Sequence, residues 1–451
     1  MKSTHALSRR NFLKSSAAAA VGLMGLAACA PPAPAGQTGA PAAAGASLIF
    51  LCDTINKGHI EVRDNWVKDF MAAHPGVKIQ HQTVPQDYNT KVQTLYAAGT
   101  PPDIYRYLQE VTPIVTVAAK KLHLQLDDYI AKDKYDLTDF RPAAVELYRW
   151  ENKIYALPRD YGNQNLFYNL DLFEKAGLQP PPADWEDKEF TFDKFLEITK
   201  ALTKKNGDRT EQWGFLVNRA QRPWASWLYS NGGALVHKDA NGVATDCALT
   251  DPASVEALQF LQDLMYKHQV APRPDVESEL GGVDLFATGR VGIMLNNPSA
   301  VNQFRTIKAF RWDVSTLPIG KAEKRGTGGG GSGWAAAAAT KAPDVAWQFV
   351  SFISSPAAET GEVKVGATTP ARTSVVKGKD FQNPSLPPAH AAAFAQAQEY
   401  VVRDPVHVNW PQITGRIYTP KMDQLWSGAK DAATVAQEIK AEADPLFAKA
   451  A

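Results

Sequence analysis

The stretch KIYALPRDYGNQNLFYNLDLF, residues 153–173, decides the fold of this chain. An apolar run at its start ends at Pro158, and a second β-like run, 166–168, follows the polar segment 159–164. Two apolar strands joined by a polar segment with a glycine can form a hairpin, or the segment can cross from one lobe of a protein to another. The rest of the chain has to distinguish these alternatives.

Short apolar strands alternate with amphipathic helices along the rest of the chain, which is typical of α/β sheets. Residues 47–52 and 77–83 are expected strands, and 59–73 is an expected helix with Trp66 and Phe70 on one face. About 400 residues remain after the N-terminal segment, which is too many for a single hydrophobic core. We therefore expect two α/β domains.

The N-terminal residues predict export rather than a folded element. Residues 8–14, SRRNFLK, form a twin-arginine motif, and a short apolar stretch leads to Leu-Ala-Ala-Cys at 26–29, which resembles a lipobox. We expect residues 1–28 to be a signal peptide, Cys29 to carry lipid, and 29–46 to be a flexible tether rich in Pro, Ala and Gly. The folded body is then anchored to a membrane on its periplasmic or extracellular side. A processed protein without lipid is the alternative.

Removal of the signal peptide determines the net charge of the mature chain, and lipid on Cys29 determines which cysteines remain free. Residues 1–29 contain four of the 48 basic residues and none of the 47 acidic ones, so the mature chain has a net charge of about −3. This charge argues against a nucleic-acid or anionic-membrane partner. Cys52 and Cys247 remain, and two buried thiols are favoured over a disulfide, which would lock two lobes together if it joined them.

Several motifs resemble those of the family 1 extracellular solute-binding proteins, the sugar-type binding proteins of ABC importers. KIYALP…FYNLDLFEKAGL resembles the segment that crosses between the lobes in that family. GTPPDIY at 99–105, LFATGRVGIM at 285–294 and TPAR at 369–372 resemble further family motifs and occur in the family's order. The chain departs from the family at Gly292, where alanine is usual, and at Ser299, where an aromatic residue commonly stacks on sugar. The resemblance covers nearly the whole mature chain.

The resemblance implies an α/β, bilobal, periplasmic-binding-protein-like fold of type II, with two lobes joined by a hinge. It implies three crossovers near 158–161, 322–334 and 369–374. The glycine-rich run 328–333 is expected to be a flexible second crossover that returns the chain to lobe 1. Both lobes are then discontinuous: 47–158 with 329–370 form lobe 1, and 159–328 with 371–451 form lobe 2.

The sequence offers no catalytic or metal-binding motif. The nine histidines show no HExxH or Cys/His metal spacing, and no G-x-S-x-G elbow is present. The glycine run lacks the Gly-Lys-Ser/Thr ending of a phosphate-binding loop. We therefore expect neither a cofactor nor an enzyme activity.

A sugar site needs flat aromatic side chains against ring faces and planar polar groups around the hydroxyls. Asp53 ends the first strand, where open α/β sheets bind ligands, although it can instead cap the following loop. Alternation along the third strand is expected to turn one of Tyr105 and Tyr107 to the cleft and the other to the core. For Trp410, core packing is favoured over the cleft. The resemblance and these positions together give the candidate ligand contacts: Asp53, Tyr105, Tyr107, Asp160, Tyr161, Gln164, Trp224, Trp227, Asn231, Asn297, Ser299, Trp334 and Arg372.

The implied function is capture of an extracytoplasmic mono- or oligosaccharide by a monomer that delivers it to an ABC permease. A polyol phosphate or phosphodiester is an alternative solute, and it requires Arg159 or Arg372 to point at the cleft; Arg159 can instead form a salt bridge across the hinge. A ferric ion would need phenolates such as those of Tyr105 and Tyr107. A secreted glycoside hydrolase, the alternative from another class, would need two facing carboxylates, with Asp160 as one of them.

Overall fold

The computed structural model of this protein describes residues 45–54, 57–280, 284–366, 369–383 and 385–449. All of them belong to one structural unit, Gly39–Ala451. The predicted signal peptide, the lipidated Cys29 and nearly all of the tether lie outside the described residues. None of the helices in the described part of the chain is long and apolar enough to cross a membrane.

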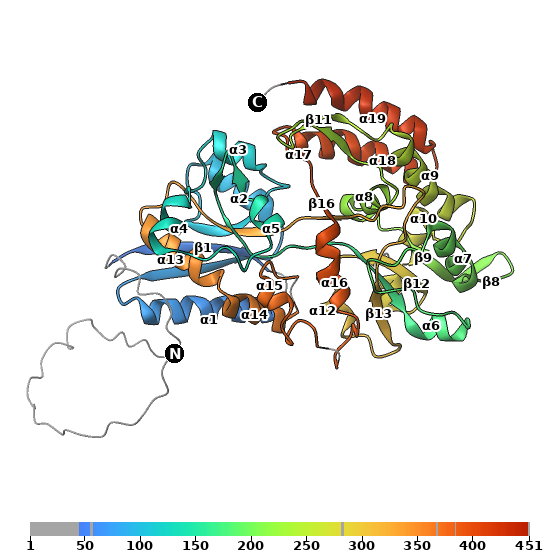
Figure 1. The fold of residues 1–451 in the computed structure, drawn as a ribbon, viewed down its shortest axis with the longest axis horizontal. Coiled ribbons are helices and arrows are strands. Elements are labelled where there is room, and N and C mark those ends of the chain that lie inside the picture. Colours follow the sequence, from blue (N-terminus) through green and yellow to red (C-terminus); the bar gives the residue numbers. More distant parts are fainter. Residues whose placement is uncertain (1–44, 55–56, 281–283, 367–368, 384, 450–451) are drawn as a thin grey trace, which may run out of the picture. The chain divides into compact units, whose positions relative to one another are not determined.

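Two five-stranded sheets organise the described residues into two lobes (Figure 1). In lobe 1, β1 is parallel to β2 and β3, while β15 is antiparallel to β3 and β6. In lobe 2, β7 is antiparallel to β12 and β13, β12 is parallel to β9, and β8 is antiparallel to β9. The strand order of the first sheet is β2 (Lys78–Val84), β1 (Ser47–Asp53), β3 (Ile104–Leu108), β15 (Ser332–Ala336) and β6 (Leu157–Pro158). That of the second is β13 (Trp312–Ser315), β7 (Asn165–Asn169), β12 (Val291–Asn296), β9 (Arg209–Leu216) and β8 (Lys204–Asn206).

Helices cover both sheets and complete two separate cores. Those of lobe 1 are α1 (Lys57–Ala73), α2 (Tyr88–Ala97), α3 (Ile114–Ala119), α4 (Asp127–Asp133), α5 (Pro142–Glu146), α13 (Pro343–Ile353), α14 (Pro356–Lys364) and α15 (Thr373–Val376). Those of lobe 2 are α6 (Leu170–Lys175), α7 (Phe192–Leu202), α8 (Gln221–Ser230), α9 (Pro252–Tyr266), α10 (Pro274–Leu280), α11 (Asp284–Ala287), α12 (Ala300–Phe304), α16 (Ala392–Ala397), α17 (Trp410–Ile413), α18 (Thr419–Trp426) and α19 (Ala432–Phe447). Smaller elements are β4 (Arg149–Trp150), β5 (Lys153–Ile154), β10 (Val236–Lys238), β11 (Ala244–Cys247), β14 (Thr327–Gly329), β16 (Val401–Arg403), the 3-10 helix η1 (Gln398–Tyr400) and the π-helix η2 (Thr414–Tyr418).

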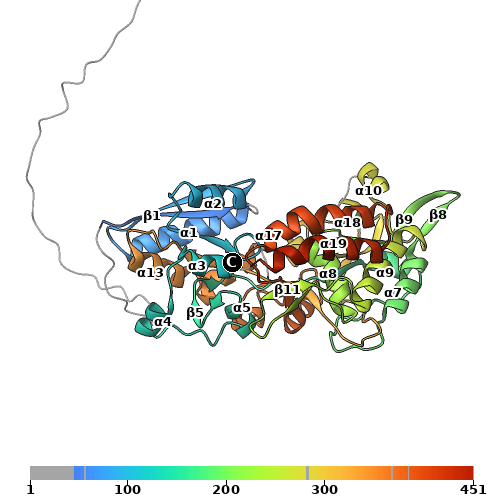
Figure 2. The ribbon, with the colours of Figure 1, turned by 90° about the horizontal axis from the view of Figure 1, so that it is seen from above.

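The stretch 153–173 is a crossover, since β6 belongs to the first sheet and β7 to the second. The chain returns to the first sheet between β13 and β15, and it passes again to lobe 2 between α15 and α16. Helices α13 and α14, from the last third of the chain, consequently lie beside α1 (Figures 1 and 2). The expectation of two α/β lobes is confirmed.

The positions of the crossovers differ slightly from the expected lobe boundaries. Strand β14 pairs with β16 rather than with either five-stranded sheet. Ala371 packs in the core of lobe 1, and Arg372 pairs with Phe140 of the same lobe. We therefore propose that lobe 1 extends through α15, beyond the expected end at residue 370.

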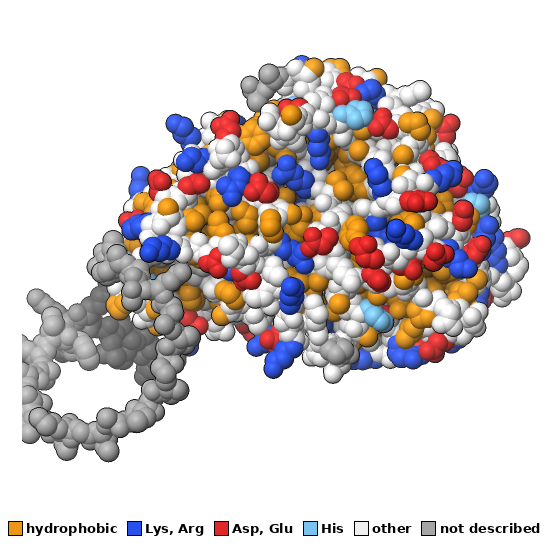
Figure 3. Space-filling view, viewed as in Figure 1, with side chains coloured by type: hydrophobic (Ala, Val, Ile, Leu, Met, Phe, Trp, Pro, Cys, Tyr) orange, Lys and Arg blue, Asp and Glu red, His pale blue; other side chains and the backbone are white. Residues whose placement is uncertain are grey.

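Two further expectations concern thiols and surface charge. Cys52 in β1 and Cys247 in β11 are free and fully buried, which confirms the prediction of two buried thiols. Basic and acidic side chains are interspersed over the face drawn in Figure 3, and the net charge of the whole chain is close to zero.

Candidate functional site

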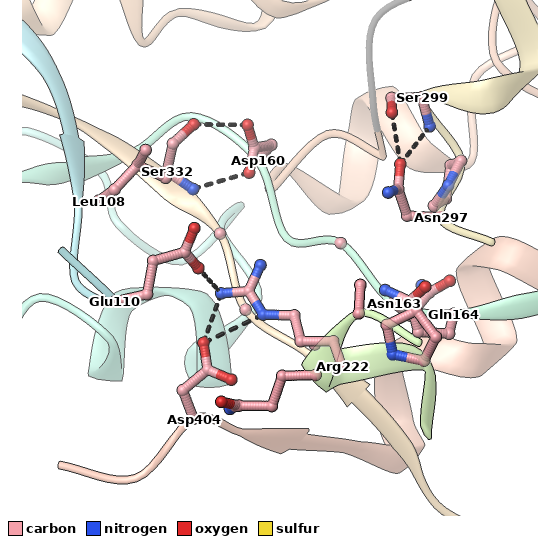
Figure 4. Close-up of a pocket in the computed structure, with 18 of the residues that line it drawn as sticks. Leu108, Glu110, Asp160, Asn163, Gln164, Arg222, Asn297, Ser299, Ser332 and Asp404 are labelled. Carbon is pink, nitrogen blue, oxygen red and sulfur yellow. Dashed lines mark hydrogen bonds and ion pairs between the residues drawn. The ribbon is translucent and has the colours of Figure 1, made fainter. Parts of the chain in front are cut away.

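A pocket of about 720 Å³ is lined by both lobes and by the crossovers between them (Figure 4). Strands β1, β3 and β12 end at or beside it, which is the edge where open α/β sheets bind ligands. A second hollow of the same volume, around His123 and Trp150, is lined by residues of lobe 1 and, among the described residues, by none of lobe 2. The interlobe pocket is therefore the candidate site. Its polar and aromatic lining residues are Asp53, Arg106, Glu110, Arg159, Asp160, Asn163, Gln164, Asn218, Gln221, Arg222, Asn296, Asn297, Ser299, Ser332, Asp404, Trp410 and Thr414.

The glycine run 328–331 is packed rather than loosely held, contrary to the expectation of flexibility. A Cβ atom on Gly328 would lie 2.5 Å from the carbonyl oxygen of Arg222, and one on Gly331 would lie closer still to the carbonyl oxygen of Asp160. Gly330 also exchanges backbone hydrogen bonds with Gly162 on the first crossover. Glycine is required here because two crossovers and the start of α8 approach at backbone distance.

Asp160 and Arg159 are held by buried contacts at the floor of the pocket. The Asp160 carboxylate accepts hydrogen bonds from the Ser332 backbone N–H at 2.7 Å and from the Ser332 hydroxyl at 2.6 Å. Arg159 forms ion pairs with Asp160 and, at 2.8 Å, with Glu362 of α14. These partners lie on the first crossover and in lobe 1, so the ion pairs do not join the two lobes as the expected salt bridge across the hinge would.

Asp53 at the end of β1 is also engaged by cations. Arg106 forms an ion pair with it, and Arg63 lies 3.5 Å from its second carboxylate oxygen. Burial raises the pKa of the Asp53 carboxyl, but Arg106, Arg63 and Arg159 together lower this pKa below its ordinary value. Asp53 is therefore ionised at neutral pH.

A cation of lobe 2 contacts carboxylates on the far side of the pocket. Nη2 of Arg222, in the first turn of α8, contacts Glu110, which follows β3 of lobe 1. The same nitrogen lies 2.5 Å from Asp404, which follows β16 (Figure 4). Burial raises the pKa of Glu110, Arg222 lowers it and Asp404 raises it, with a net shift upward. This ion pair links the two lobes across the pocket.

Five of the predicted contacts are brought together in the pocket: Asp53, Asp160, Gln164, Asn297 and Ser299. The Asn297 carboxamide oxygen accepts from the Ser299 backbone N–H at 2.9 Å, so these two residues form one turn after β12 (Figure 4). These five predicted residues therefore line the candidate pocket.

The predicted tyrosines of β3 lie elsewhere, in the core of lobe 1. Tyr105 hydrogen-bonds to His123, and the Tyr107 hydroxyl donates to the Thr112 carbonyl at 2.7 Å. Residues two apart in a strand face the same side, so the expectation that they would face opposite sides was wrong. Arg106, between them, faces the pocket instead.

The predicted tryptophans also pack in the cores. Trp227 contacts Phe195 and Phe215, with ring centroids 5.0 Å and 5.5 Å away, and Trp224 belongs to the same lobe 2 core. Trp334 lies in the lobe 1 core, and the centroid of its ring is 5.6 Å from the guanidinium carbon of Arg63 and equally far from that of Arg159. Large rings are needed to fill these interiors, so none of the three lines the pocket.

Tyr161, Asn231 and Arg372 have structural partners outside the pocket. The Tyr161 backbone N–H donates to the Thr369 carbonyl, joining two crossovers. The Asn231 side chain donates to the Ala253 carbonyl at 2.9 Å. Arg372 donates to the Ser354 carbonyl, Asp139 and the Tyr135 hydroxyl and stacks on Phe140. We leave all three out of the proposed site.

Sequence reasoning missed many of the lining residues, among them Arg106, Glu110, Asn163, Arg222 and Asp404. The spacing of Arg106 between two core tyrosines could have identified it, and Asn163 is adjacent to a predicted contact. Glu110 and Asp404 lie in loops and carry no sequence signal. Trp410, expected in the core, both packs there and lines the pocket.

The donor set does not favour a ferric ion. Burial raises the pKa values of Tyr105 and Tyr107 well above the ordinary value, which disfavours phenolates. No group of three or more His, Cys, Asp or Glu side chains that could hold a metal occurs among the described residues.

Comparisons with known proteins agree with this architecture. A family model described as bacterial extracellular solute-binding protein matches residues 65–389. A putative binding protein from Brucella abortus is 23% identical over 427 residues, covering 90% of this chain and 97% of that protein. An ABC substrate-binding protein from Listeria monocytogenes, solved in complex with cycloalternan, has a TM-score of 0.77 at 23% identity, covering 89% of this chain and 99% of that one. The GacH receptor of Streptomyces glaucescens, solved unliganded and with acarbose, has a TM-score of 0.74 at 22% identity and covers 89% and 98%. The expected bilobal α/β fold is confirmed by these similarities.

Proposed function

Because the chain belongs to the bacterial extracellular solute-binding proteins, we propose that it is the substrate-binding protein of an ABC importer and captures a carbohydrate in the interlobe pocket. The observation that carries this proposal is that both lobes and the crossovers contribute polar side chains to one pocket. A solute held by both sides stabilises the closed arrangement of the lobes, because the open arrangement offers only half of these contacts.

The lining suits a mono- or oligosaccharide, whose hydroxyls both donate and accept hydrogen bonds. Asn163 and Gln164 are almost fully buried, and the carbonyl oxygen of each side chain has no donor within the described part of the chain. Such buried acceptors are costly unless a ligand supplies a donor. Trp410 adds an aromatic surface to which the apolar face of a sugar ring can pack.

The remaining parts of the proposal concern transport. We propose that the twin-arginine pathway exports the chain, that lipid on Cys29 anchors it outside the cytoplasm, and that it delivers its solute as a monomer to the permease. The solute leaves chemically unchanged. Asp160, the expected acid of a hydrolase, is already occupied by Arg159 and by both donors of Ser332, which favours a structural role.

A phosphorylated polyol or phosphodiester is less favoured by the charges of the pocket. Arg159 does line the pocket, but its guanidinium is paired with Asp160 and Glu362. Arg372 is paired with Asp139 outside the pocket. An anionic solute would therefore have to displace carboxylates that already satisfy these cations.

A thermal-shift screen of the purified protein against saccharides, polyol phosphates, amino acids and ferric ion tests the proposal. A ligand that binds only the folded state raises the melting temperature by mass action. We expect a shift with one group of saccharides, each of which is recovered intact by chromatography. A shift with phosphates or iron alone, no shift with any saccharide, or a cleaved sugar would contradict the proposal.

A further inference from the structure

The pocket is lined by more negatively charged side chains than positively charged ones. Asp53 is paired with Arg106, and Asp160 with Arg159. Glu110 and Asp404 share the third lining cation, Arg222. The described lining thus holds four carboxylates and three guanidinium groups, with neither lysine nor histidine among them.

The unbalanced charge is concentrated at one end of the pocket. Glu110 and Asp404 contact the same nitrogen atom, Nη2 of Arg222 (Figure 4). Within the described residues, Arg222 is the only group that donates a hydrogen bond to either carboxylate. Two carboxylates that share one nitrogen repel each other, and the one guanidinium that contacts them compensates only one of the two charges. Lys238 of β10 interacts with Asp404 at longer range, and no ion pair between the two occurs among the described residues. One oxygen of each carboxylate is left to accept from another donor.

We propose that the solute carries a protonated amine and that Glu110 and Asp404 hold this ammonium group, so that the bound carbohydrate is an amino sugar or another amine-bearing saccharide. This inference rests on the proposed function of the same pocket. An ammonium group has three hydrogen-bond donors and one positive charge. Its donors match the free oxygen of each carboxylate, and its charge matches the one carboxylate that the guanidinium groups of the lining do not compensate.

Two other observations agree with this assignment. The amide oxygens of Asn163 and Gln164 have no donor among the described residues, and the hydroxyls of the same solute can supply one if these buried side chains turn toward the pocket. The pKa of Glu110 is raised by burial and by Asp404, with Asp160 adding to the rise, while Arg222 and Arg106 oppose it. Burial is the main cause of the rise and repulsion from Asp404 adds to it, and a bound ammonium group would stabilise the ionised carboxylate against both.

Isothermal titration calorimetry with matched sugars tests the inference. Each set has one sugar with a hydroxyl, a free amine or an acetylated amine at the same carbon, such as glucose, glucosamine and N-acetylglucosamine, as monosaccharides and short oligomers. We expect the free amine to bind at least tenfold more tightly than its neutral partners at pH 7. This preference should weaken as the pH falls, because protonation of Glu110 removes the charge that attracts the ammonium group.

Two isosteric variants, Glu110→Gln and Asp404→Asn, remove one charge each without changing size. Either is expected to reduce the preference for the amine to threefold or less. Glu197→Gln is the matched control, since it removes the charge of an exposed carboxylate of α7 that lies outside the pocket. This control should retain the full preference, and the melting temperature of each variant checks that it folds.

The possible results separate the inference from the proposed function. Equal affinity for amine and neutral sugars, or a preference that survives in both pocket variants, overturns the inference and leaves carbohydrate capture standing. Binding of phosphorylated ligands alone overturns both. If no saccharide binds, with or without an amine, the proposed function itself fails.

Discussion

Replacement of Gly328 by alanine should disturb both the stability of the protein and the geometry of the pocket. The added Cβ would lie 2.5 Å from the carbonyl oxygen of Arg222, 3.1 Å from its Cα and 3.2 Å from its carbonyl carbon. Ordinary contact begins at 3.4 Å, so the closest approach is about 0.9 Å too short. All three atoms are backbone, so no side-chain rotation relieves the clash. We expect a loss of about 3 kcal/mol, at the upper end of the cost of overpacking.

Urea unfolding followed by tryptophan fluorescence measures this loss. The midpoint for Gly328→Ala should fall, with the slope of the transition unchanged. Gly415→Ala is the matched control, because Gly415 is exposed in the π-helix η2 and a Cβ there would meet nothing within 4 Å. An alanine at this helical position should leave stability unchanged or raise it by up to about 1 kcal/mol. Equal midpoints for Gly328→Ala and the wild type would refute the reasoning.

Two further predictions concern charged groups. The pKa of Asp53 is lower in the folded protein than in the unfolded chain, so its ionised form stabilises the fold above about pH 4. That stability is lost as the pH falls through the folded pKa. The melting temperature of Asp53→Asn should therefore fall less steeply with decreasing pH than that of the wild type. Parallel curves of melting temperature against pH for the variant and the wild type would contradict this. Arg372→Lys should lower stability by roughly 2 kcal/mol, because lysine cannot reproduce the planar contacts to Asp139 and Tyr135. Solute affinity, measured by calorimetry, should stay within twofold of the wild type, since Arg372 lies outside the pocket; a tenfold loss would place it at the site.

Local patterns predicted the fold well because strands and crossovers have clear sequence signatures. The residues of the polar segment 159–164 were compatible with either a hairpin or a crossover between lobes. The order of the other motifs favoured the crossover. The glycine run shows the limit of this reasoning. Its length suggested flexibility, whereas Gly328, Gly329 and Gly331 each lie against a backbone segment that is far away in the sequence.

The site was harder to predict because it depends on which face of each element is buried. Tryptophan is attractive for a sugar site, but the largest rings were needed to fill the two cores, as Trp227 and Trp334 show. Polar residues at strand ends and on the first crossover, such as Asp53 and Gln164, were better candidates because topology places them at the pocket. Arg222 and Glu110 come from different lobes, and no local pattern relates them.

Calorimetry on Gln164→Ala, with a saccharide that raises the melting temperature, tests the central claim of carbohydrate capture most directly. The backbone N–H and carbonyl of Gln164 are bonded to the Thr327 hydroxyl, and these bonds remain when the side chain is removed. The carbonyl oxygen of that side chain has no donor in the described residues. We predict an affinity loss of at least tenfold, about 1.4 kcal/mol. The melting temperature of the free variant should fall, because a buried side chain is truncated, but the variant should still unfold in one cooperative transition. Gln93→Ala, on the exposed side of α2, should bind as the wild type does. Wild-type affinity in Gln164→Ala would contradict the assignment of this pocket as the carbohydrate site.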